Sequence, residues 1–106
     1  MDNPVLVYTT WPDAAAAEAA GRALVAAKLA ACVNILPGMV SLYAWKGAIE
    51  EASETVMIIK TAAARADAVT AAVRDAHPYE TPAILTLPVS GGEPAYLAWI
   101  AAESRG

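Results

Sequence analysis

A continuous run of β-favouring residues opens the chain and is followed by a helical pattern. Residues 5–10 read Val-Leu-Val-Tyr-Thr-Thr directly after Pro4, which predicts a central, buried strand that stops at Trp11. Apolar and small residues then recur three and four positions apart, which predicts a helix from about residue 14 to 30. Asp13 immediately precedes this pattern, and its carboxylate suits the N-cap position.

The middle of the chain has the pattern of a long β-hairpin. Residues 32–36 and 39–45 are rich in β-branched and aromatic side chains, and Pro37-Gly38 between them indicates a bulge or kink in an edge strand. Residues 46–50 are expected to form the turn, and residues 53–61 the returning strand. Strands that reach past the body of a small domain expose backbone edges and apolar faces, so we expect another subunit to cover them.

The last third of the sequence predicts a helix, a strand and a short helix. Apolar positions with helical spacing run from Ala66 to Ala76, and Pro78 is expected to end this helix. An apolar run at 83–89 predicts a short buried strand, residues 90–94 a loop, and residues 96–100 an amphipathic helix. The order β-α-β-β-α-β plus a helix indicates an α+β fold, the ferredoxin-like split βαβ sandwich with an antiparallel sheet, as one domain over residues 1–106.

The amino-acid composition excludes several classes of protein function and favours an oligomer. The sequence is 58% hydrophobic and 17% charged, a balance that favours oligomerisation in so small a chain. It offers no apolar run long enough to span a membrane and no basic segment ahead of an apolar one at its start, so a cytoplasmic location is expected. The net charge of −4 and the scattered basic residues argue against nucleic-acid binding. A single cysteine excludes an internal disulfide framework.

Candidate chemistry concentrates at the junction between the second helix and the fourth strand. His77, the only histidine, is followed by Tyr79 and Glu80 between two prolines. One interpretation is a ligand site. The other is structural, with His77 at the negative end of the helix dipole and Tyr79 packed over the sheet.

Two further observations concern metals and catalysis. Cys32 and His77 are the soft metal ligands in the chain apart from its methionines, although Cys32 also fits a small buried hydrophobe. There is no Ser-His-Asp set, no phosphate-binding glycine loop and no close acid pair beyond Glu50-Glu51, which indicates a protein that is not an enzyme.

A set of short motifs is spread over nearly the whole chain. They include Lys28-Leu29-Ala30-Ala31-Cys32-Val33-Asn34, Pro37-Gly38, Trp45-Lys46-Gly47, Ser53-Glu54, Ile59-Lys60-Thr61, His77-Pro78-Tyr79-Glu80 and Tyr96-Leu97 with Trp99-Ile100. At this spacing they resemble the CutA family of divalent-cation tolerance proteins. The resemblance implies a homotrimer with PII-like architecture, a role in the response to copper or another divalent cation, and no required cofactor. Cys32 is the only thiol, and Ala83 stands where many relatives have a glutamate.

In such a trimer the helix-to-strand junction is expected to face a cleft between subunits. Trp45, Lys60, His77, Tyr79 and Glu80 are the candidate ligand-binding residues there, and Cys32 and His77 the candidate metal ligands. Two alternatives stay open: a PII-like signalling module that binds a small anionic ligand, and a structural or anchoring trimer.

Overall fold

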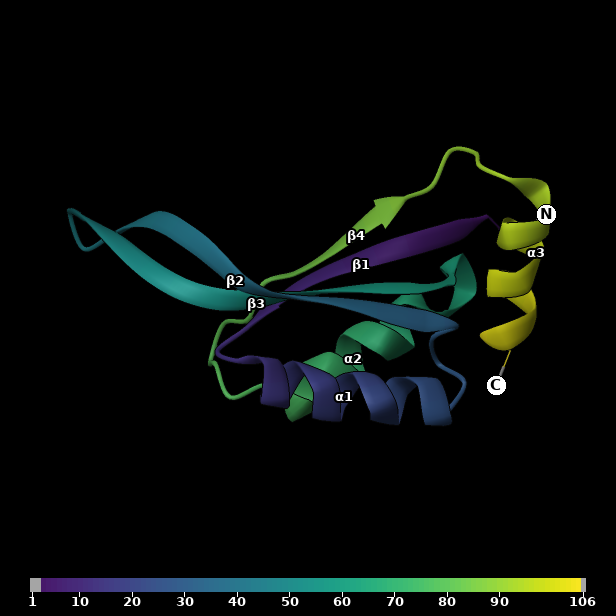
Figure 1. The fold of residues 1–106 in the computed structure, drawn as a ribbon, viewed down its shortest axis with the longest axis horizontal. Coiled ribbons are helices and arrows are strands. Elements are labelled where there is room, and N and C mark those ends of the chain that lie inside the picture. The colour runs from purple at the N-terminus through teal and green to yellow at the C-terminus, as the bar shows by residue number, and fades with distance from the viewer. Residues whose placement is uncertain (1–2, 106) are drawn as a thin grey trace.

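The computed structural model describes residues 3–105, which form one sheet and three α-helices (Figure 1). The expected order and fold class are confirmed. The elements are β1 (Pro4–Trp11), α1 (Ala14–Ala26), β2 (Cys32–Trp45), β3 (Ala48–Ala62), a 3₁₀ turn (Ala63–Arg65), α2 (Ala66–Ala76), β4 (Ile84–Pro88) and α3 (Pro94–Glu103).

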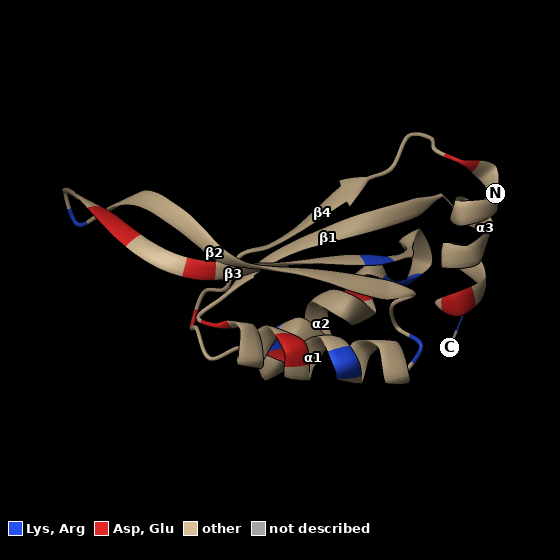
Figure 2. Cartoon of the chain, viewed as in Figure 1, with Lys and Arg blue, Asp and Glu red and all other residues tan. Residues whose placement is uncertain are grey.

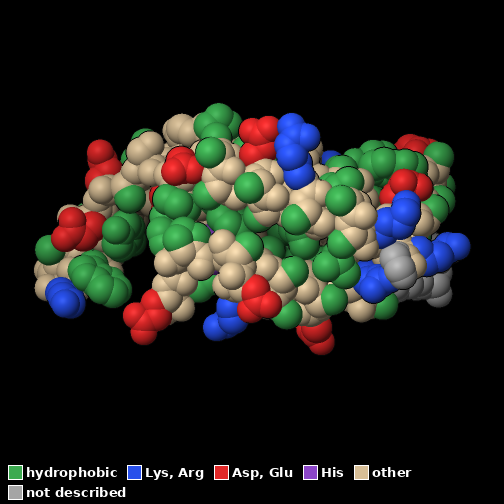
Figure 3. Space-filling view, turned by 90° about the horizontal axis from the view of Figure 1, so that it is seen from below, with side chains coloured by type: hydrophobic (Ala, Val, Ile, Leu, Met, Phe, Trp, Pro, Cys, Tyr) green, Lys and Arg blue, Asp and Glu red, His purple; other side chains and the backbone are tan. Residues whose placement is uncertain are grey.

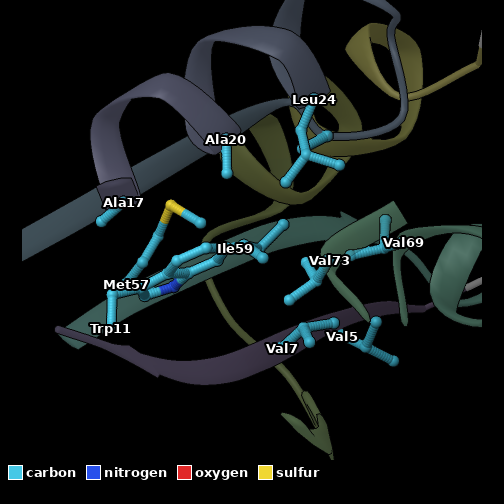
Figure 4. Close-up of a cluster of buried hydrophobic side chains, with 11 residues drawn as sticks. Val5, Val7, Trp11, Ala17, Ala20, Leu24, Met57, Ile59, Val69 and Val73 are labelled. Atoms are coloured by element: carbon cyan, nitrogen blue, oxygen red, sulfur yellow. The ribbon is translucent and has the colours of Figure 1, made fainter. Parts of the chain in front are cut away.

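The sheet is antiparallel throughout, with strand order β2-β3-β1-β4. Helices α1 and α2 cover one face, and α3 lies at the end of the sheet remote from the hairpin (Figure 1). Side chains of β1, β3 and both long helices meet between these layers, among them Val7, Trp11, Met57, Ile59 and Val73 (Figure 4). The predicted central position and burial of the first strand are therefore confirmed.

The β2–β3 hairpin extends well beyond the body of the domain (Figure 1). Its turn consists of Lys46 and Gly47 alone, with Trp45 paired to Ala48 and φ angles of 50° and 81° at the two turn residues. Two residues of positive φ form the type I′ turn, whose twist matches that of the strands. The expected turn over 46–50 was therefore too long, and the returning strand begins at Ala48 rather than at residue 53.

The Pro37-Gly38 interruption is confirmed as an irregularity within one strand. The pairing of β2 with β3 shifts register between Leu36 and Met39, and Gly38 has a φ of 80°. β2 is an edge strand, as predicted, and Pro37 lies in the stretch of β2 that has no paired partner on β3, so its missing amide hydrogen interrupts no regular pair.

Helix α1 ends at Ala26, four residues before the predicted end. Lys28 has a φ of 58°, and the amide groups of Lys28 and Leu29 donate to the carbonyl oxygens of Val25 and Leu24. This is the Schellman arrangement, which usually places glycine where Lys28 stands. The sequence therefore gave no signal for the helix end.

The C-terminal part differs from the prediction in burial and in length. β4 is shorter than expected and mostly exposed, with Leu85 and Leu87 open to solvent, because it forms the second edge of the sheet. α3 is longer than predicted, since Pro94 occupies its first turn and the Glu93 carboxylate accepts a hydrogen bond from the Tyr96 amide. No helix within residues 3–105 is long and apolar enough to cross a membrane.

Candidate functional site

The register of the hairpin places aromatic and acidic side chains on one of its faces. Tyr43 pairs directly with Glu50, Trp45 lies two positions beyond Tyr43, and Glu54 lies two pleats from Glu50 along β3. Because side chains alternate between faces, these four residues share a face. Figure 2 shows the acidic positions along β3 and a basic residue at the tip of the hairpin.

His77 holds the segment that follows α2 against the sheet. Its extended backbone conformation ends the helix, which confirms its predicted place, and its ring is buried and stacked on Trp11 with centroids 4.2 Å apart. Nε2 lies 2.7 Å from the carbonyl oxygen of Thr10, and Nδ1 lies 3.2 Å from the amide nitrogen of Tyr79. A carbonyl only accepts and an amide only donates, so the ring is the neutral Nε2–H form with both nitrogens engaged.

Tyr79 connects His77 to the β2–β3 hairpin. Its ring lies 4.7 Å from that of His77, and its hydroxyl donates to Glu54 Oε2 over 3.1 Å. Desolvation by burial, followed by the hydrogen bond to Glu54, raises the pKa of Tyr79 above the ordinary value for tyrosine. The phenol is therefore kept as a neutral hydrogen-bond donor between the two segments.

A cavity of about 550 Å³ lies between the hairpin and this segment. We call it the hairpin cavity, and its lining residues are Tyr43, Trp45, Glu50, Tyr79, Glu80 and Thr81. The space-filling view shows a hollow beside the hairpin, with hydrophobic side chains on the hairpin wall (Figure 3). Of the residues predicted from sequence, Trp45, Tyr79 and Glu80 thus meet within one subunit, while His77 supports them from beneath Tyr79.

Lys60 and Cys32 lie elsewhere, at the end of the sheet beside α3. They are paired across β2 and β3, Lys60 Nζ donates to the Tyr96 hydroxyl over 3.0 Å, and Cys32 Sγ lies 3.8 Å from the same oxygen. The hydrogen bond to Tyr96 raises the pKa of Lys60, against a smaller opposing effect of burial. Within one subunit the predicted set therefore divides into two places, and a meeting of Lys60 with the others across copies of the chain stays a prediction.

The candidate metal ligands are also separated within the subunit. Cys32 pairs with Lys60 on the sheet, whereas His77 contacts Thr10 near the opposite end of β1. Among residues 3–105, no three histidine, cysteine, aspartate or glutamate side chains are grouped so that they could hold a metal ion.

Glu50, Glu54 and Thr81 are not among the candidate ligand-binding residues predicted from the sequence. The two-residue turn is the sequence signal that would have placed Glu50 opposite Tyr43. Once Lys46-Gly47 is taken as a type I′ turn, Tyr43 must stand opposite Glu50.

Comparison with known proteins agrees across sequence and structure. The model of the family described as CutA1 divalent ion tolerance protein matches residues 5–103. The divalent-cation tolerance protein CutA of Pectobacterium atrosepticum is 44% identical over 97% of this chain and 94% of its own length. The crystal structure of divalent ion tolerance protein CutA1 from Ehrlichia chaffeensis superposes with a TM-score of 0.94 at 31% identity, covering 100% of this chain and 99% of that one.

A third relative bears on the compartment. The CutA structure from Archaeoglobus fulgidus has a TM-score of 0.91 at 37% identity, covering 96% of this chain and 99% of that one, and that protein is described as periplasmic. The cytoplasmic location expected here from sequence therefore stays a prediction.

Proposed function

Because the chain belongs to the CutA1 divalent ion tolerance protein family, we propose that it supports divalent-cation tolerance as a non-enzymatic homotrimer whose hairpins pack on neighbouring subunits. The observation that carries the assembly is the apolar surface of the hairpin. Val40, Leu42 and Ile49 are 61%, 68% and 82% exposed in the single subunit. Obligate interfaces resemble a hydrophobic core cut in half, and this hairpin has the corresponding surface.

Sedimentation equilibrium tests the assembly. We expect a single species of three times the chain mass that persists at micromolar concentration, because obligate subunits are rarely stable alone. A folded species with the mass of one chain would contradict the proposal.

Copper is the divalent cation that we propose to test first, and Cys32 is the ligand that would reach it. Both ring nitrogens of His77 are already engaged within the subunit, which leaves the Cys32 thiol as the remaining soft group of the predicted pair. One thiol per chain cannot form a site alone, so the copies would have to contribute together.

Copper titration of the wild type and of Cys32→Ser tests this part. Loss of tight binding in the variant, with the assembly retained, is the expected outcome, and proton release on binding should depend on pH. Unchanged stoichiometry in Cys32→Ser would remove the thiol from the proposal.

A PII-like signalling module that binds a small anion is the second candidate, and Lys60 favours it. Within residues 3–105 the Lys60 ammonium has a phenol as its hydrogen-bond partner and no carboxylate within ion-pair distance. Anion binding that Lys60→Gln abolishes would support this candidate over the metal. Failure of both metal and anion to bind would favour the third possibility, a structural or anchoring trimer.

A further inference from the structure

The hairpin cavity combines aromatic rings with carboxylates, and we propose that it binds an organic cation, a quaternary or alkylated ammonium group. This inference goes beyond divalent-cation tolerance and does not depend on it. It rests on three properties of the cavity: its rings, its charge and its rigidity.

Three aromatic side chains line the cavity and remain accessible in the subunit. Tyr43, Trp45 and Tyr79 come from two segments far apart in sequence, and each ring is between 38% and 59% exposed. The negative faces of such rings attract cations, and alkylated ammonium groups are recognised by aromatic cages. Lys46 Nζ lies 5.9 Å from the centroid of Trp45, so this ring already accepts an ammonium group of the chain, which a ligand would have to displace.

The charged residues of the lining are all acidic. Glu50 comes from the hairpin and Glu80 from the opposite wall, and neither lysine nor arginine is among the lining residues that the structure describes. Glu54, which accepts the hydrogen bond from the Tyr79 hydroxyl, adds a third carboxylate beside the lining residues. Carboxylates on both walls favour a positive ligand and oppose an anionic one.

An alkylated ammonium suits this lining better than a metal ion. Aromatic rings supply no lone pairs for coordination, and the described chain groups no three metal-ligating side chains here. An alkylated ammonium needs no directional ligands and gains from contact with the rings. The volume of about 550 Å³ falls within the range of small-molecule sites.

The wall formed by Tyr79 is held in place before any ligand arrives. His77, itself stacked on Trp11, contacts the Tyr79 ring in a tilted arrangement, and the hydrogen bond to Glu54 holds the hydroxyl end of the same ring. A preorganised ring loses little freedom on binding, so more of the interaction energy appears as affinity.

Choline chloride is the probe, and its uncharged isostere 3,3-dimethyl-1-butanol is the matched control. In the assembled protein, the indole N–H signal of Trp45 is followed by NMR while each compound is added at constant ionic strength. We expect a saturable shift with choline and at least about tenfold weaker binding of the alcohol, because both the rings and the carboxylates distinguish the charge. Equal binding of the two compounds, or no shift with choline, would overturn the proposal.

Variants separate the rings from the carboxylates. We expect Trp45→Leu, Glu50→Gln and Glu80→Gln each to weaken choline binding about threefold to thirtyfold. For Trp45→Leu, which lacks the reporter, binding is measured by calorimetry. Trp99→Leu, which removes an exposed ring on α3 outside the cavity, should leave the affinity unchanged.

Sedimentation of each variant shows whether the assembly is retained. Should Trp45→Leu dissociate the subunits, the two glutamine variants still decide, because they keep the shape of the side chain. Choline binding that both glutamine variants leave intact would overturn the proposal. If a second copy of the chain fills the cavity, choline will not shift the Trp45 signal, and this result would also overturn the proposal.

Discussion

His77 is the residue whose role the structure defines most closely. Both ring nitrogens are hydrogen-bonded, the ring is buried, and it lies between Trp11 and Tyr79. These contacts give His77 a structural role at the end of α2, through Trp11, Thr10 and Tyr79 rather than through the helix dipole considered from the sequence. The side chain also positions Tyr79, so it supports the hairpin cavity without lining it.

Replacing His77 should therefore affect stability first. We expect His77→Ala to lower the free energy of unfolding by about 2–4 kcal/mol, because it leaves a cavity and two unpaired backbone groups. His77→Phe, which retains a ring for stacking, should lose less. Thermal and denaturant unfolding of both variants provide the measurement, and a wild-type midpoint in His77→Ala would contradict this role.

Tyr79 should ionise later than an ordinary tyrosine. Burial and the hydrogen bond to Glu54 raise its pKa, so the neutral phenol is favoured in the folded chain. The resulting stabilisation is complete below the ordinary tyrosine pKa of about 10 and is lost as pH rises through the higher folded value.

Alkaline titration monitored by phenolate absorbance tests this pKa. We expect a late component that Tyr79→Phe removes and that Glu54→Gln moves to lower pH. A late component that survives in Tyr79→Phe would assign it to another tyrosine.

At the scale of elements, the approach of α1 to the sheet depends on Gly21. A Cβ at this position would lie 2.8 Å from Val33 Cγ2 and 3.0 Å from Met57 Sδ. Gly21 lies inside the helix, where alanine would otherwise be favoured by about 1 kcal/mol. Close packing therefore outweighs helix propensity at this position.

Gly21→Ala should consequently destabilise the protein, by about 1–2 kcal/mol after the gain in helix propensity is counted. In the background of Val33→Ala, which removes the nearest clashing methyl group, the same change should cost less. Denaturant unfolding of the two single variants and the double variant gives the coupling energy. Stabilisation by Gly21→Ala in the wild-type background would show that the helix moves away from the sheet at no cost.

At the scale of the whole molecule, the extended hairpin exposes the apolar surface through which the subunit is proposed to associate with other copies. Its strands have 14 and 15 residues in a domain of 106 residues, and its outer part carries exposed apolar side chains. Such a surface promotes aggregation of a lone subunit and forms an interface in an assembly. The exposed edge strand β4 with Leu85 and Leu87 fits the same account.

The proposed assembly predicts that stability depends on protein concentration. We expect the melting midpoint to rise with concentration, because association stabilises the folded subunits by mass action. Ile49→Asp should lower the midpoint and the sedimenting mass, although the side chain is largely exposed in the single subunit. Glu18→Gln, at an exposed position on α1 outside the hairpin, is the control and should change neither. A midpoint independent of concentration together with a wild-type Ile49→Asp would count against the assembly.

The sequence by itself determined the order of the elements, the fold class and the place of His77. Hydrophobic periodicity and proline positions are local signals, and they fixed the first strand, the irregular edge strand and the end of α2. They failed at the end of α1, where Lys28 adopts a conformation that usually calls for glycine, and at β4, whose apolar run lies on an edge.

Only the tertiary structure decided which candidate residues meet. It brought Trp45, Tyr79 and Glu80 to one cavity and placed Lys60 and Cys32 beside α3. The reason is that proximity between distant segments depends on strand register and on packing, and a short turn at Lys46-Gly47 sets the partner of every residue in the hairpin. Residue types alone carry no such information.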